Sequence, residues 1–303
     1  GVNTTGGANV AMGHVALDAN TTGDNNTAIG RAALSGNTTA DNNTAVGYNA
    51  LLSNTTGSEL TAVGQNSLQA NTTASDNAGF GHSALEANTT GARNVAVGKN
   101  SLAANTTAAN NTAVGNSAMA ANTTGSENVG VGRNALDTLT TGDDNTAIGQ
   151  GALNNVTTGG GNVGIGVNSG ADAAVNITSE DNRGVFGHTA ITNAYIKVDW
   201  TVTSDARDKM NFAEVPHGLS FVNDLQPIKF DFKKSRDDAT PHGRTKYGFK
   251  AQDILALEGD NPIIIDNEFE DNLRITNSHL MPVLVKAIQE LSTALDAALA
   301  PEL

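Results

Sequence analysis

A serine and a lysine stand five residues apart in the segment Ser204 to Lys209, which reads S-D-A-R-D-K. A serine hydroxyl becomes a useful nucleophile when a base removes its proton, and a lysine can be that base if its amine is neutral when it acts. The chemistry to expect is nucleophilic attack by the serine hydroxyl. Taken alone, this spacing is more typical of an exposed loop, so the rest of the chain must decide the interpretation.

Other candidate sites are weaker. The chain has no cysteine, so neither thiolate metal sites nor thiol nucleophiles are available. His217, His242 and His279 lack an ordering acid and a hydrolase-like order, which favours surface or capping histidines over a triad. The acidic turns at 24–26 and 143–145 lack the regular aspartate spacing of calcium-binding β-rolls, so we expect solvated turns, no metal and no cofactor.

Composition separates the two halves of the chain. Only 4% of residues are aromatic, and just Tyr48, Phe80 and Phe186 of these precede residue 190, so the first half has too few large side chains for a globular core. The formal charge of −14 argues against nucleic-acid binding, which depends on clustered Lys and Arg. Apolar runs long enough for a membrane span are missing, so we expect no membrane insertion.

The first half repeats with a strict period. The unit is close to N-T-T-G-x-x-N-T-A-V-G-x-x-A-L-x-A, and its central glycine recurs every 17 residues without insertion. The glycines are Gly13, Gly30, Gly47, Gly64, Gly81, Gly98, Gly115, Gly132, Gly149 and Gly166. A register held this long predicts a repeat architecture and excludes simple disorder.

The unit is too short for a helix pair, but two strands of four or five residues and two turns would use it up. We therefore expect a mainly β rod, either a β-roll or β-solenoid or an interleaved triple β-helix. The apolar column before each glycine and the following leucine column should form a thin core, with Asn and Thr in hydrogen-bonded ladders. Because one coil buries so little, we expect a homotrimer.

Residues 3–170 resemble the repetitive heads of trimeric autotransporter adhesins, whose short N-x-x-A-x-G-x-x-A coils form a trimeric β-roll. The unit is longer here and lacks that family's usual neck sequence. The resemblance implies a β-roll trimer.

The period breaks after Gly166. The next matching glycine, Gly187, comes late, which indicates an insertion from Ala171 to Glu180. The segment Tyr195–Val202 alternates like a strand, and the remaining aromatic residues all fall from Tyr195 onward. We divide the chain into a rod at 1–170, a junction with a strand at 171–199, and a small α+β domain at 200–303.

Three features organise the last part. An alternating strand is predicted at 225–232, and G-F-K-A-Q-D at 248–253 leads into a short helix. The chain ends in an amphipathic helix capped by Asn277 or Ser278, with Pro282 in its first turn. A coiled-coil seam is expected at Leu280, Leu284, Ala287, Leu291, Ala294 and Ala298.

The order S-D-x-R-x-K, G-F-x-A-Q-[DE] and A-I-x-E-L resembles the endosialidase-type intramolecular chaperone of phage tail spikes and fibres, over about residues 200–300. The resemblance implies a domain that trimerises the preceding rod and then cuts itself off. It makes Ser204 the nucleophile, Lys209 its base, Asp205 the adjacent acidic residue, and Thr203–Ser204 the scissile bond.

The resulting hypothesis is a structural phage tail fibre or spike shaft, assembled in the host cytoplasm and located in the virion. Its expected partners are two more copies, other virion tail proteins, and a host receptor or glycan. The alternatives are a trimeric bacterial surface adhesin and the stalk of a glycan-degrading spike. Since Gly1 falls in mid-repeat, we expect a piece of a longer protein.

Overall fold

The computed structural model describes residues 3–172, 175–188, 191, 204–233, 236–268 and 273–300. The chain forms two compact units, Gly1–Thr189 and Ala190–Leu303, and each is described by itself. The strand expected at 195–202 lies outside the described residues.

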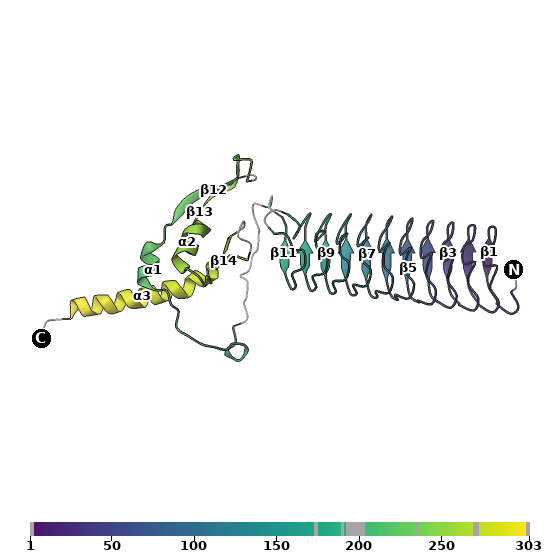
Figure 1. Ribbon diagram of the computed structural model, residues 1–303, viewed down its shortest axis with the longest axis horizontal. Helices are drawn as coiled ribbons and strands as arrows, with labels where there is room; N and C mark the ends of the chain where they lie inside the picture. The colour runs from purple at the N-terminus through teal and green to yellow at the C-terminus, as the bar shows by residue number, and fades with distance from the viewer. Residues whose placement is uncertain are drawn as a thin grey trace. The chain divides into compact units, whose positions relative to one another are not determined.

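The first unit is a β-solenoid in which each 17-residue coil contributes one strand to a single parallel sheet (Figure 1). The strands lie in sequence order, and each residue pairs with its equivalent one coil later, as Thr44 does with Thr61. The strands are β1 Val10–Met12, β2 Thr27–Ile29, β3 Thr44–Val46, β4 Thr61–Val63, β5 Ala78–Phe80, β6 Val95–Val97, β7 Thr112–Val114, β8 Val129–Val131, β9 Thr146–Ile148, β10 Val163–Ile165 and β11 Gly184–Phe186. Because the pairing is within one chain, the rod is a solenoid and not an interleaved triple β-helix.

The prediction of two longer strands per coil was wrong. Each coil has one strand of three residues, and turns build the rest. These turns still bond coil to coil through the backbone, as where Leu34 N–H donates to Ala50 and Thr21 N–H donates to Thr38. The backbone polar groups are thereby paired without a second sheet.

The leucine column is buried as predicted, but the apolar column before the glycine is not part of the core. In β3 the middle residue Ala45 is fully buried, whereas Thr44 and Val46 on either side of it point outward. Side chains alternate along a strand, so the short alanine faces inward and its neighbours face out. The core is therefore alanine packed against leucine, and the β-branched residues line an outer surface.

Buried leucines occupy an unusual backbone conformation. Leu34 has φ of 51° and Leu51 has φ of 53°, in the left-handed region where a bulky residue costs about 1–2 kcal/mol. Burying a leucine side chain contributes about 1.5–3 kcal/mol, which offsets that cost with little left over. One leucine per coil thus gives the rod a core of small net stabilisation.

Buried asparagines form a ladder through the rod, as predicted. In each coil the Asn side-chain amide donates to the Asn side-chain carbonyl of the preceding coil, for example Asn71 to Asn54 at 2.9 Å. The ladder runs from Asn3 to Asn122 and then meets Leu139. Asn122 Oδ1 consequently has no hydrogen-bond partner among the described atoms. A second set of threonine hydroxyls, such as Thr55 Oγ1 to Thr72 O, ties the adjacent corner together.

The repeated glycine is required by backbone geometry. Gly64 has φ of 138°, and a Cβ added there would overlap the carbonyl oxygen of Gly81 in the next coil. Neither strain nor overlap can be relieved by moving a side chain, because the opposing atom is backbone. This explains why glycine marks the period.

The insertion after residue 170 does not end the sheet. Ile177 N–H donates to Gly170 O, and the Ile177 side chain is buried in the same column as Val156. The backbone of Thr157 then bonds to Thr178, 21 residues on, and β11 pairs with β10. The extra residues bulge from one coil while the stacking continues.

The second unit is small and mixed α+β, as predicted (Figure 1). Its elements are η1 Ala206–Asp208, α1 Leu219–Asp224, β12 Ile228–Lys233, β13 Pro241–Gly248, α2 Ala251–Glu258, β14 Ile265–Asp266, β15 Arg274–Ile275 and α3 Asn277–Leu299. The strands form two antiparallel pairs, β12 with β13 and β14 with β15. Its core gathers side chains from distant segments: Phe221, Leu225, Ile254, Ile264, Ile265, Leu280 and Val283.

The terminal helix differs in detail from the prediction. It begins at Asn277 after Thr276, which makes no side-chain cap, so Pro282 lies inside the helix and not in its first turn. Leu280 and Ala287, expected in a coiled-coil seam, are buried within the chain's own unit. Leu284 and Leu291 of the expected seam are exposed, and with Met281, Ile288 and Leu295 they form an exposed apolar stripe on α3. Val285 and Leu299 are the other large apolar side chains exposed on this helix.

Candidate functional site

The structure brings Ser204 and Lys209 together at the start of the described part of the second unit. The Lys209 ammonium donates a hydrogen bond of 2.6 Å to Ser204 Oγ. The one-turn helix η1 folds the chain back between them, so that side chains five residues apart meet. In this arrangement a neutral Lys209 amine would be placed to accept the Ser204 proton.

Asp205 binds Arg207. Its carboxylate accepts from the Arg207 backbone N–H at 2.9 Å, which caps η1, and forms an ion pair with the guanidinium at 2.6 Å. The Arg207 side chain lowers the pKa of Asp205, and Asp205 raises the pKa of Arg207. Asp205 therefore orders the turn that carries the dyad, and it keeps the Arg207 charge paired.

Both members of the dyad are exposed in the single chain. Thr203, on the other side of the expected scissile bond, lies outside the described residues. A proton transfer from serine to lysine is helped by exclusion of water, and the surroundings of Ser204 in one chain do not exclude it. The hydrogen bond positions the two groups, but the dyad lacks a closed environment.

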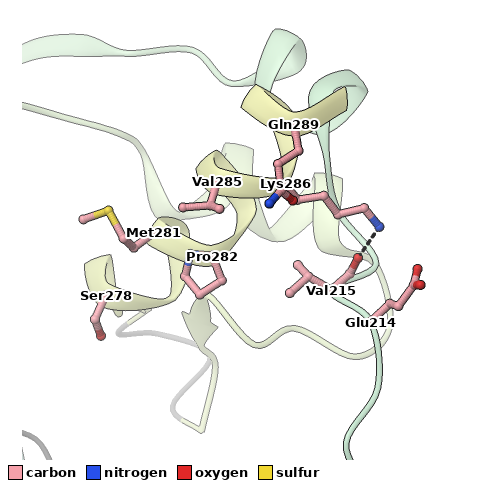
Figure 2. Close-up of a pocket in the computed structure, with 8 residues that line it drawn as sticks. All are labelled: Glu214, Val215, Ser278, Met281, Pro282, Val285, Lys286 and Gln289. Atoms are coloured by element: carbon pink, nitrogen blue, oxygen red, sulfur yellow. Dashed lines mark hydrogen bonds between the residues drawn. The ribbon is translucent and has the colours of Figure 1, made fainter. Parts of the chain in front are cut away.

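The segment after the dyad is anchored by α3. Lys286 Nζ donates to the carbonyl of Val215 at 2.6 Å, beside a shallow pocket also lined by Pro282 and Val285 (Figure 2). Neither Ser204 nor Lys209 lines this pocket. The contact ties the chain that follows the dyad to the terminal helix.

Glu290, from the A-I-x-E-L motif, has a structural position that the sequence did not show. Its carboxylate accepts from the backbone N–H of Leu219 at 2.7 Å and lies against Gly218, where a Cβ would overlap it. A carboxylate at a helix start satisfies a donor that the helix itself leaves unpaired. Glu290 thus joins α3 to α1, and only the three-dimensional structure reveals this pairing across the chain.

The G-F-K-A-Q-D motif also has a packing role. Phe249 and Ala251 pack against the core, and α2 buries Ile254 within it. Glu258 at the end of α2 accepts three backbone hydrogen bonds, from residues 263 to 265. The motif therefore builds the unit and does not contact the dyad in the described contacts.

The remaining candidates lie apart from one another. His217 stacks on Phe221 with ring centroids 4.3 Å apart, His279 Nδ1 lies 2.7 Å from Ile263 O, and His242 is in β13 opposite Phe232. In the acidic turns, Asp24 and Asp143 accept backbone N–H groups of the preceding coil. Among the described residues there is no cluster of three or more His, Asp or Glu side chains arranged for a metal ion.

Residues 204–260 match the family model Peptidase_S74, whose description is chaperone of endosialidase. The match begins at Ser204 and takes in both the dyad and the G-F-K-A-Q-D motif, while α3 follows it. No curated protein and no solved structure matched the chain significantly.

The resemblance to the endosialidase-type chaperone is therefore confirmed for this segment, and the rod before it is confirmed as a β-solenoid. A solenoid rod followed by such a segment fits a protein of the tail-fibre or tail-spike type with a C-terminal chaperone. The described helices include none with the length and apolar character to cross a membrane.

Proposed function

We propose that this chain is part of the shaft of a phage tail fibre or spike, and that its second unit trimerises the rod, assists its folding and then cuts the chain before Ser204. The observation that carries the proposal is the Ser204–Lys209 hydrogen bond at the first residue of the chaperone match. In this proposal 200–303 is the chaperone and peptidase domain; the rod, expected to end at 170 before a junction at 171–199, continues as a sheet to β11.

The rod has a physical reason to need a separate assembly unit. Its coils are nearly identical, so a shift of one chain along another by a whole coil changes few contacts. Three chains that meet at random would have many registers of similar energy. The second unit contains no repeat, so it gives the three chains one common starting point.

The terminal helix offers the contact surface for that step. Met281, Leu284, Ile288, Leu291 and Leu295 are exposed and recur at spacings of three and four, typical of a helix-to-helix seam. Exposed apolar stripes of this length mark association surfaces. Three such helices packed together would bury them and hold the chains in register.

The cleavage step follows from the connectivity of the chain. Ser204 Oγ attacks the carbonyl carbon of Thr203, whose peptide bond to Ser204 breaks, leaving an ester to Oγ. Lys209 takes the hydroxyl proton and delivers it to the departing α-amine of Ser204. Water then hydrolyses the ester and frees residues 204–303. Asp205, by binding Arg207, is a positioning residue for this turn.

Cleavage should depend on assembly because the dyad is exposed in a single chain. Neighbouring copies would cover it, exclude water and favour the neutral lysine. Removal of the second unit afterwards makes assembly of the rod irreversible. The released shaft would join other tail proteins in the virion after assembly in the host cytoplasm, where it would meet a host receptor or glycan.

A denaturing gel tests the cleavage. The unmodified chain should give a shortened band and a fragment of residues 204–303, while Ser204→Ala and Lys209→Met should give only the full-length band. Ser220→Ala and Lys229→Met change exposed residues of the same types and should cleave as the unmodified chain does. Normal cleavage of Ser204→Ala would show that the dyad assignment is wrong.

A further inference from the structure

The outward side of the rod's sheet carries no charge from one end to the other. The third residue of every strand is apolar, while the first is threonine in β2, β3, β4, β7 and β9. In each three-residue strand the first and third side chains point outward, and none of the residues in β1 to β11 is charged. Parallel pairing in register aligns these side chains into one stripe, here called the outer sheet face. Its exposed members are Val10, Met12, Phe80, Val95, Val97, Ile148, Ile165 and Phe186.

Few large apolar side chains are exposed elsewhere on the described part of the rod. The other large apolar side chains exposed on the described rod are Val15, Tyr48 and Val167, and all three lie in the turn that follows the glycine, next to this face. Single exposed apolar residues are ordinary, but a contiguous stripe along the whole rod marks an interaction surface.

Opposite charges border the two sides of this face. The turns before the strands form an edge that is acidic on balance, here called the acidic edge: its basic residues are Arg93 and Arg183, and the turns before β1, β7 and β10 are uncharged. Its acidic residues are Asp24, Asp41, Glu59, Asp76, Glu127, Asp143, Asp144 and Asp181. The position directly after the glycine is basic in three coils, at Arg31, Lys99 and Arg133, and acidic in none, and it is here called the basic edge. Asp18, Glu86 and Asp137 lie four residues further along this turn. Coil-to-coil hydrogen bonds align each edge, as from Asn42 N–H to Asp24 O and from Asn49 N–H to Arg31 O.

This pattern is complementary to itself in one orientation. When identical rods turn their outer sheet faces to a common axis and run parallel, the acidic edge of each lies beside the basic edge of the next. When two such rods run antiparallel, acidic meets acidic and basic meets basic. Like-charge juxtaposition suppresses the second arrangement. The surface therefore selects parallel copies of the same chain.

We infer that the outer sheet face of β1 to β11 is the surface through which two further copies of this chain pack against the rod, parallel and in register, with acidic edge against basic edge. The number of copies rests on the proposed function; the face and the direction rest on the rod itself. The uncharged strands would be buried at the axis, and the threonine corners would remain on the outside.

Cysteine cross-linking tests the face, because the chain has no cysteine of its own. Val97→Cys places a thiol on the outer sheet face, and Thr90→Cys places one on the exposed Asn-Thr-Thr corner of the same coil. Both variants are made in the full chain with Ser204→Ala and treated with a short bis-maleimide. Val97→Cys should give linked dimers on a denaturing gel, at least about tenfold more than Thr90→Cys.

Met12→Cys, near one end of the rod, tests the direction. It should link to itself, because parallel chains in register bring the two Met12 positions together. The native mass of each variant is measured before linking, and a monomer overturns both proposals. A trimer in which Thr90→Cys links and Val97→Cys does not overturns the face alone. Linking at Val97→Cys without linking at Met12→Cys overturns the parallel direction.

Discussion

The two units of this chain are stabilised in different ways. The rod repeats the same few contacts from coil to coil: a buried leucine or methionine, one or two buried alanines, an asparagine ladder, and backbones that bond to the next coil. The second unit uses each contact once, and its core joins α1, α2, β14 and α3 from across the sequence. The stacking of coils within one rod is therefore well specified, but identical coils do not define the register in which a second chain would align. In the proposed function, the second unit supplies a reference point for that register.

This difference predicts where each unit is vulnerable. In the rod the critical atoms are backbone groups and buried amides, so small changes there should have large effects. In the second unit the critical contacts are between particular side chains, so the effects should be local. Substitutions in the two units can test this contrast.

The largest effect is expected from Gly64→Ala. The added Cβ meets the backbone of Gly81 in a conformation with φ of 138°, so the coils must separate. The loss should be about 4 kcal/mol or more of the rod's unfolding free energy, measured by denaturant titration. Gly184→Ala is the control, because a Cβ there meets nothing and the expected change is below about 0.5 kcal/mol. Equal effects at both sites would contradict the stacking argument.

The asparagine ladder gives the next effect. Asn71→Leu leaves Asn54 Oδ1 without its donor and Asn88 Nδ2 without one acceptor, which should cost about 1–3 kcal/mol. Asn122→Leu is the matched control at the end of the ladder.

Asn122→Leu removes the unpaired Asn122 carbonyl, but Asn105 Oδ1 loses the donor that Asn122 supplied. One side-chain carbonyl is therefore unpaired in this variant, as in the unmodified chain. Its unfolding free energy should remain closer to that of the unmodified chain. If Asn122→Leu is as destabilising as Asn71→Leu, the ladder is not what stabilises this corner.

In the second unit, Glu290→Gln weakens the charge-assisted bond to Leu219 N–H. We expect the unfolding free energy of that unit to fall by about 1–2 kcal/mol and that of the rod to stay unchanged. Hydrogen exchange of α1 and of the rod strands measures both. Asp296→Asn removes the same charge from an exposed position on α3 and should leave both unchanged. A change in rod exchange with Glu290→Gln would show that the units are not independent.

The smallest effect concerns Asp137, whose pKa is raised mainly by burial, with Oδ1 unpaired among the described atoms. A raised native pKa means that the folded chain holds this proton more tightly than the unfolded chain. The cost of ionising it is absent below the unfolded pKa and complete above the folded one. Asp137→Asn should raise the unfolding free energy at neutral pH by less than about 0.5 kcal/mol, seen as a slightly higher Tm, and the two melting curves should converge in acid. A difference independent of pH would contradict this cause.

The sequence predicted much of the rod because a strict period constrains every coil at once. It failed on which side of the strand faces inward, since Val and Ile before the glycine look like core residues. The strand places Ala28 inward and Ile29 outward, and no composition rule reveals that alanine suffices for so thin a core. The prediction of a second strand in each coil was also wrong. Residues such as Leu34 adopt the left-handed conformation, which leucine rarely takes and which its residue type therefore does not predict.

In the second unit, the spacing of Ser204 and Lys209 together with the resemblance to the chaperone family was enough to propose the dyad, and the structure adds their hydrogen bond. The pairing of Asp205 with Arg207 and of Glu290 with Leu219 could not be derived, because each depends on local or long-range folding. Leu280 and Ala287 fitted a helix seam by periodicity, but periodicity cannot tell a seam to another chain from a face buried in the same unit.

The central claim, that the second unit assembles three rods, is tested most directly by native mass measurement of the full chain with Ser204→Ala. The account predicts a particle of three times the chain's 30.9 kDa. It predicts monomers when Ile288→Lys and Leu291→Lys are added on the exposed stripe of α3, since those charges prevent the helices from packing. A monomer without the added charges, or an unchanged trimer with them, would contradict it.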